Sequence, residues 1–198
     1  MKRRIQSERG AALIFALMGM TVLMALGAAL VLITSTETVI AGNFRNGRQA
    51  FYAAEAAVEL AIAELREGAD WTAIVQGAER SRFVDGVPDG PRALPSDAPV
   101  DLTVLRNLAN CNTPVPCGGA TRWHLFAYGP LGDFASPGDS TSPFYVVAFV
   151  SEAPGAGGEL GVIIRAEAFG PNGARQALEV TMSRTGAGPA AVVRTVLA

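Results

Sequence analysis

The sequence predicts an α+β fold in which a long N-terminal helix packs on a small antiparallel β-sheet. Three observations predict it. An uncharged apolar run extends from Ala11 to Ile33, and apolar residues recur at helical spacing from Phe44 to Leu65. Strand-like runs then alternate with glycine- and proline-rich turns through the C-terminal half. We therefore divide the chain into residues 1–10, 11–33, 34–67 and a β-rich head, 68–198.

The apolar run is long enough to cross a membrane. Residues 11–33 would form a helix of roughly 35 Å, and a bilayer core needs about 20 apolar residues. The residues Lys2, Arg3, Arg4 and Arg9 precede it. Because basic residues stay on the cytoplasmic side, we expect a single-pass membrane protein with a cytoplasmic N-terminus and the rest of the chain outside the cytoplasm.

Three interpretations of this run stay open at this point. It is a plain anchor, a secretory signal peptide cut near 27–29, or a helix preceded by a short basic leader cut between Gly10 and Ala11. The apolar residues Leu30 to Ile33 lie beyond the small-residue site and count against the signal peptide.

The helix is expected to continue beyond the membrane. The residues predicted to pack on the sheet are Phe44, Phe51, Val58, Ile62 and Leu65, which recur on one side of a helix. One helix from about Ala11 to about Glu67 would be roughly 85 Å long. Gly42 is the expected weak point, and two helices joined at 41–43 are the alternative.

In the head we expect a short helix near 70–76, with Asp70 as its N-cap. The predicted strands are 100–105, 122–128, 144–151, 160–169 and 174–183. Asn172-Gly173 predicts a hairpin turn between the last two. In the final predicted strand, 174–183, polar and apolar residues alternate. This alternation predicts one face toward water and a second face, with Leu178, Val180 and Met182, which covers the helix. The sequence does not decide the conformation of 185–198.

Composition and motifs favour a structural or binding protein over an enzyme. The net charge is −2, so no basic excess points to nucleic acid. The single histidine, His124, lies in a strand-like run, and no catalytic or phosphate-binding motif accompanies it, so no cofactor or metal is expected. Cys111 and Cys117 are expected to form a disulfide in an oxidising compartment, with free thiols as the alternative.

Two sequence blocks resemble PilX-type prepilins. The run from Glu8 to Ile14 is similar to the processing site of that family, and residues 41–45 with 49–57 are similar to its second conserved block. The resemblance implies that 1–10 is a prepilin leader, that a prepilin peptidase cuts between Gly10 and Ala11, and that the new amine of Ala11 is methylated. The apolar helix would then leave the membrane for the core of a fibre.

One position departs from the pilin pattern. Most pilins carry a glutamate at the fifth mature position, where it pairs with the amine of a neighbouring subunit, and here that position is Phe15. A buried unpaired amine is unfavourable. We therefore expect a minor pilin that primes or caps a fibre near its tip, unless Phe15 simply faces lipid.

The resemblance also implies partners: other minor pilins, the major pilin, prepilin peptidase, an inner-membrane assembly platform and a tip adhesin. It links the chain to pilus-dependent adhesion and motility. The alternatives are a minor pseudopilin of type II secretion and a membrane-anchored periplasmic binding domain without a fibre, with an exported enzyme third.

Overall fold

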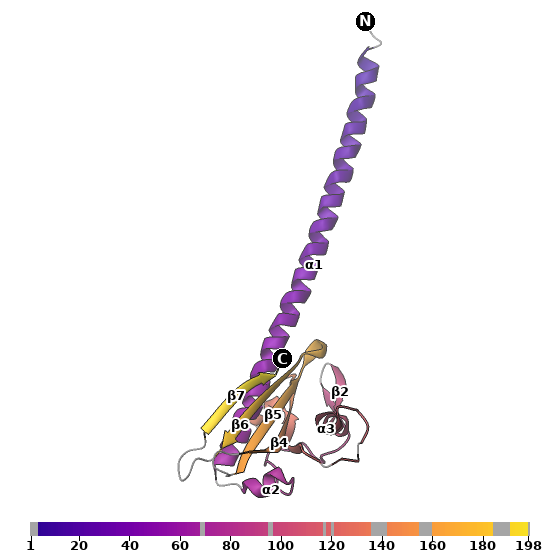
Figure 1. Cartoon of the computed structure of the whole chain (residues 1–198). Helices are drawn as coiled ribbons and strands as arrows, with labels where there is room; N and C mark the ends of the chain where they lie inside the picture. The colour runs from indigo at the N-terminus through magenta and orange to yellow at the C-terminus, as the bar shows by residue number, and fades with distance from the viewer. Residues whose placement is uncertain are drawn as a thin grey trace. The chain divides into compact units, whose positions relative to one another are not determined.

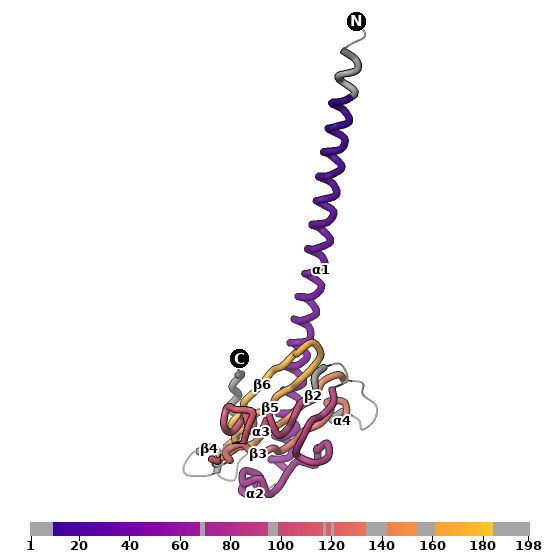
Figure 2. The backbone as a smooth tube through the Cα atoms, turned by 90° about the vertical axis from the view of Figure 1, so that its right-hand side faces the viewer, coloured from indigo at the N-terminus to yellow at the C-terminus, as the bar shows by residue number. Residues whose placement is uncertain are grey.

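The computed structural model describes residues 4–67, 70–94, 97–116, 118–119, 121–135, 142–154, 160–183 and 191–197. The chain divides into two compact units, residues 1–44 and 45–198. The helix α1, Arg4–Arg66, contributes to both. The β-rich fold of the second unit can be followed in Figure 1, and Figure 2 traces its backbone in a view turned by 90°.

The helix α1 is uninterrupted in its assigned residues, so the expectation of one long helix is confirmed and the alternative of two helices is wrong. Gly42 and Gly47 both lie inside it. Glycine in a helix interior is unfavourable by about 1 kcal/mol relative to alanine. The alanine-rich residues 50–63, a strong helix-forming sequence, evidently outweigh that loss.

The head is built on a five-stranded antiparallel sheet of order β3-β4-β5-β6-β7. Its strands are β3 (His124–Pro130), β4 (Tyr145–Pro154), β5 (Leu160–Phe169), β6 (Arg175–Ser183) and β7 (Ala191–Leu197). The strand predictions for 122–128, 144–151, 160–169 and 174–183 are confirmed within a few residues. The tail that the sequence left undecided contributes β7, which pairs with β6. The short helix α4 (Leu131–Ala135) follows β3.

The turn between β5 and β6 has the geometry that its sequence predicts. Asn172 and Gly173 both have positive φ, 57° and 71°, and the Ala174 amide donates to the Pro171 carbonyl over 3.2 Å. Positive φ at both central residues is the requirement of a type I′ hairpin turn. The 3-10 segment η2 (Pro171–Gly173) covers the same residues.

One face of the sheet packs on the C-terminal part of α1. The helix contributes the buried alanines Ala50, Ala53, Ala54, Ala57 and Ala61, together with Val58, Ile62 and Leu65. The sheet contributes Val162, Ile164, Leu178, Val180 and Met182, among others. The predicted buried face of the strand 174–183, which is β6, is therefore confirmed. Phe51 is partly buried against the same cluster.

A short helix follows α1, as expected. It is α2 (Trp71–Val75), and the Asp70 carboxylate accepts from the amides of Thr72 and Ala73 as its N-cap. The Trp71 indole donates to the Leu65 carbonyl over 2.9 Å. This hydrogen bond ties the new helix to the end of α1.

The other face of the sheet is also covered over β3 and β4, whereas the expected wet face of β6, with Ala177, Glu179, Thr181 and Ser183, is half-buried and lies outside the cluster that covers these two strands. A second cluster comprises Val100, Leu102, Leu105, Trp123, Leu125, Tyr128, Tyr145, Val147 and Phe149. It lies under the helix α3 (Leu102–Cys111) and a hairpin of β1 (Pro91–Leu94) and β2 (Asp97–Asp101). Because the side chains of β4 enter both clusters in alternation, this strand is buried on both faces.

The predicted strand 100–105 is wrong, because the chain turns into α3 at Asp101. The Asp101 carboxylate accepts from the amides of Thr103 (2.8 Å) and Val104 (3.1 Å), which is an N-cap. The β-branched Thr103 and Val104 give this segment a strand-like composition. The N-cap at Asp101 favours a helix instead. The buried Leu102 and Leu105 are three residues apart, which places both on one face of that helix.

The predicted packing of Phe44 is also wrong, because its side chain is 70% exposed. Residues seven apart drift by about 20° around a helix. Since Phe51 already lies at the edge of the buried face, Phe44 falls outside it. The first buried side chain of α1 after it is Asn46, and the alanine face follows from Ala50.

These positions give a matched pair of variants for helix–sheet packing. We expect Leu65→Ala to lower the free energy of unfolding by about 2–5 kcal/mol, because Leu65 is fully buried and its truncation leaves a cavity. Phe44→Ala should change it by less than about 0.5 kcal/mol, since Phe44 is exposed. Urea unfolding of the full chain in detergent measures both. Equal losses in the two variants would contradict the assigned face.

Candidate functional site

The most prominent functional feature of the first unit is the exposed apolar surface of α1. Leu13, Phe15 and Met24 are 63%, 73% and 76% exposed, and the leucines, valines and methionines around them are similarly exposed. By length and composition α1 is able to cross a membrane. An apolar surface of this extent is unfavourable in water and marks contact with lipid or with other apolar helices.

The hydroxyl side chains of α1 between Thr21 and Thr38 are satisfied by the helix itself. The hydroxyl of Thr21 donates to the Met18 carbonyl over 2.8 Å. The hydroxyls of Thr34, Ser35, Thr36 and Thr38 likewise donate to carbonyls three or four residues earlier. An unpaired donor in an apolar medium is unfavourable. These hydroxyl groups therefore do not oppose placing the helix in lipid.

The residues predicted for processing lie at the start of this surface. Gly10 and Ala11 are exposed helical residues, and Phe15 follows one turn later. The sequence holds no acidic residue from Ala11 to Thr36, and Glu37 is the first. Leader cleavage and methylation of Ala11 remain predictions.

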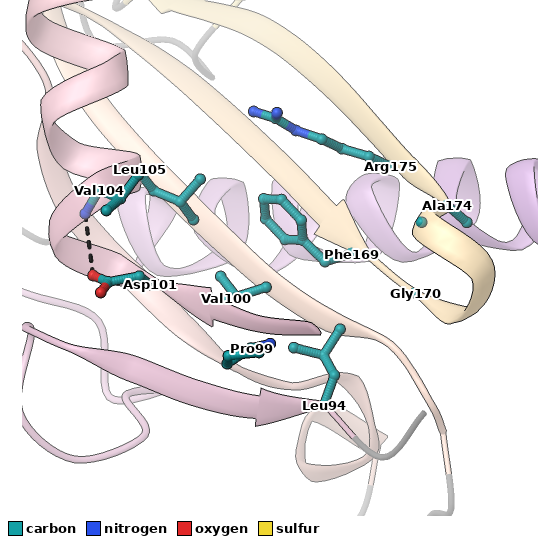
Figure 3. Close-up of a pocket in the computed structure, with 11 residues that line it drawn as sticks. Leu94, Pro99, Val100, Asp101, Val104, Leu105, Phe169, Gly170, Ala174 and Arg175 are labelled. Atoms are coloured by element: carbon teal, nitrogen blue, oxygen red, sulfur yellow. Dashed lines mark hydrogen bonds between the residues drawn. The ribbon is translucent and has the colours of Figure 1, made fainter. Parts of the chain in front are cut away.

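In the head, an apolar groove of about 340 Å³ lies between α3, the β1–β2 hairpin and the turn after β5. Figure 3 shows the ring of Phe169 inside it, with Leu94 and Leu105 among the residues around it. The Asp101 carboxylate, already used as the cap of α3, lies at its edge. The groove offers apolar contact and no group arranged for catalysis.

A buried carboxylate pairs with two arginines beside this groove. Glu167 is buried, and its Oε1 accepts from the Nε of Arg165 over 3.0 Å. Its Oε2 accepts from the Nε of Arg175 over 3.1 Å and also from a terminal nitrogen of that guanidinium. Arg175 lies over the Phe169 ring at 5.2 Å. The sequence analysis missed this cluster, although Arg165 and Glu167 share a face of β5 by their spacing of two residues.

Two tyrosines of the second cluster contact the loop before β1. The Tyr145 hydroxyl donates to Asp85 over 3.3 Å, and the Tyr128 hydroxyl donates to the Gly86 carbonyl over 2.7 Å. Burial raises the pKa of Tyr145, and the negative charge of Asp85 raises it further. Burial likewise raises the pKa of Tyr128. Both phenols therefore stay neutral and serve as hydrogen-bond donors that fix the loop.

The same loop wraps around Arg92. Its guanidinium donates to the carbonyls of Asp85 (3.1 Å), Asp89 (3.2 Å) and Pro91 (3.1 Å), and also to that of Val87. This arginine orders the loop by giving its carbonyl groups a shared donor. Its role is structural.

The cysteine pair falls partly outside the described residues. Cys111, the last residue of α3, is disulfide-bonded. Cys117 lies outside the described residues, so the Cys111–Cys117 bond is kept as a prediction. Across the described part of the chain, no three His, Cys, Asp or Glu side chains come together as a metal site.

Glu167 gives a test of the buried ion cluster. We expect Glu167→Gln to destabilise the head by about 1–3 kcal/mol, because it leaves two guanidinium groups without their counter-charge. Glu179→Gln is the control, since Glu179 lies on the neighbouring strand β6, is half-buried and makes no ion pair within the described residues. Thermal unfolding of both variants measures the difference. A Glu167→Gln protein as stable as the control would show that the cluster does not contribute.

The comparisons with known proteins identify the N-terminal segment. Residues 9–59 match the family described as PilX N-terminal, and the match leaves residues 60–198 outside it. No curated protein and no solved structure matches the chain. The matched residues include all of the second block and all but Glu8 of the first block on which the resemblance to PilX-type prepilins was based, so that resemblance is confirmed over 9–59. Residues 9–59 of this chain therefore form a PilX N-terminal segment, the segment expected in a PilX-type pilin.

Proposed function

We propose that this protein is a minor pilin that primes or caps a type IV pilus-like fibre, at or near its tip. The observation that carries the proposal is an exposed apolar stretch of α1 that is uncharged from Ala11 to Thr36, begins directly after Gly10, and lies inside the segment that matches PilX. Such a helix suits two environments, the lipid bilayer before assembly and a bundle of similar helices afterwards.

The terminal position follows from Phe15. An α-amino group has a pKa near 7.7–8.0 and is largely charged at neutral pH. Burying that charge without a partner is unfavourable. A subunit repeated along the shaft would place its residue 15 where a neighbour's amine needs an acid, and a phenyl ring supplies none. A subunit at the end of the fibre has no such neighbour on one side.

Assembly of this kind involves partners and a compartment. The chain would enter the bacterial inner membrane with its N-terminus in the cytoplasm and its head in the periplasm. Prepilin peptidase would release residues 1–10, and other minor pilins, the major pilin and an inner-membrane platform would receive the mature protein. A tip adhesin is a further partner if the head is exposed at the end of the fibre.

Processing gives the first test. Co-expressed with a prepilin peptidase, the chain should lose Met1 to Gly10 and gain one methyl group on Ala11, as read by intact mass and N-terminal sequencing. Gly10→Asn should leave the leader in place. An intact Met1 in the wild type would favour a plain membrane anchor, and a start near Leu30 would favour a secreted domain. Either result would overturn the proposed pilin.

Position in the fibre gives the second test. We expect Phe15→Glu to raise the number of copies per fibre by about tenfold or more, since a gain of about 1.4 kcal/mol at each shaft site multiplies occupancy tenfold. Quantitative mass spectrometry of sheared fibres, relative to the major pilin, measures it. Phe15→Leu is the matched control and should stay at the low wild-type number. Equal copy numbers for the two variants would refute the link between Phe15 and a terminal position.

A further inference from the structure

A second pocket of the head, of about 400 Å³, lies on a part of the surface that the fibre proposal does not use. Its walls come from the segment after α2, the loop before β1, α3 and the start of β3. The residues that matter here are Gly77, Arg80, Arg106, Thr121, Trp123 and His124. Unlike the apolar groove beside Phe169, this pocket is lined by polar and apolar groups in similar measure.

The charges around this pocket are unbalanced. Arg80, Arg106 and His124 line it, and no carboxylate is among its lining residues. Arg106 pairs with Asp89 over 2.9 Å, and both side chains stay partly exposed. Arg80 is exposed and makes no ion pair within the described residues. Arg82, two residues further, pairs with Glu64 and Glu67. Among the residues that the structure describes, the guanidinium of Arg80 therefore lines the pocket without an ion-pair partner.

The wall of the pocket is fixed by hydrogen bonds. The Asn110 side-chain oxygen accepts from the amides of Arg122 (2.7 Å) and Trp123 (2.8 Å), and its amide group donates to the Trp123 carbonyl over 3.0 Å. Trp123 is buried below this backbone. A wall ordered in advance reduces the entropy lost when a ligand binds.

The imidazole of His124 lies against Gly77, at a position that only glycine can occupy. Gly77 has φ +74°, and a Cβ placed there would lie 2.3 Å from the Nδ1 of His124. Any side chain at 77 would therefore displace the ring. Burial lowers the pKa of His124, and its hydrogen bond to the Thr121 backbone raises it. With burial the larger effect, the ring is neutral at neutral pH and is available to take up a proton.

We propose that this pocket binds an oxyanion, a phosphate or carboxylate group of a solute, between Arg80, Arg106 and His124. A guanidinium is planar and presents paired donors that match the oxygens of both groups. Arg80 supplies the uncompensated charge, and Arg106 supplies a second guanidinium whose charge Asp89 already balances. An anion held beside His124 stabilises the imidazolium, so binding strengthens as pH falls through the pKa of His124.

Because the chain holds one histidine, its ring signals in an NMR spectrum need no assignment. The full chain, in a non-ionic detergent at constant ionic strength and neutral pH, is titrated separately with inorganic phosphate and with acetate against a chloride reference. We expect a saturable shift of the His124 ring signals in at least one titration. Saturation by phosphate alone assigns a phosphate ligand, and saturation by acetate alone assigns a carboxylate.

Two arginine variants make the assignment specific. Arg80→Gln should weaken binding at least about tenfold, since a hydrogen bond to a charged group is lost. Arg82→Gln, an exposed arginine outside the pocket, should bind as the wild type does. Gly77→Ala, which displaces the His124 ring, should weaken binding while Arg80 remains. A non-saturating shift, or equal affinity in the two arginine variants, would overturn the proposal. None of these results depends on fibre assembly.

Discussion

The packing of α1 on the sheet is the interaction on which the head depends. Alanines occupy the centre of the buried helix face, and alanines 148, 166 and 168 lie in the same cluster on the sheet. Each alanine side chain is a single methyl group, and the longer side chains of Val58, Ile62 and Leu65 pack in the same cluster. A larger side chain at the centre would separate helix and sheet, and interiors packed at this density do not absorb added volume without strain.

The middle of the sheet is buried on both of its faces. The helix covers one face, while α3 and the β1–β2 hairpin cover the other. Polar side chains buried between these layers need hydrogen-bond partners, and three of them show how these are supplied. Glu167 is held by two arginines, and the tyrosines 128 and 145 are held by the loop that Arg92 orders. The rigid head that results carries both pockets, and each lies where α3 meets another element of the fold.

Local sequence signals predicted the elements that they govern directly. The apolar period placed α1, strict alternation placed β6, and Asn172-Gly173 placed the hairpin turn, because each depends on neighbours in the chain. The predicted strand 100–105 contains the β-branched Thr103 and Val104, which favour strands, whereas the cap at Asp101 starts a helix at Leu102. Phe44 was misplaced because periodicity alone does not tell where the head ends along α1. Arg175 meets Glu167 only through the register of β5 and β6, and the oxyanion pocket joins residues distant in sequence through tertiary packing. One sequence specifies neither.

The hydroxyl groups of α1 also affect the free energy of transferring the helix from lipid to a protein environment. Each of these side chains carries its acceptor on its own helix, so extraction from a bilayer breaks none of these hydrogen bonds and creates no new demand for one. These hydroxyl groups therefore do not favour lipid tails over neighbouring protein, and the apolar surface around them responds to packing and contact area. The helix can therefore move from lipid to an apolar protein environment without breaking a hydrogen bond of these side chains.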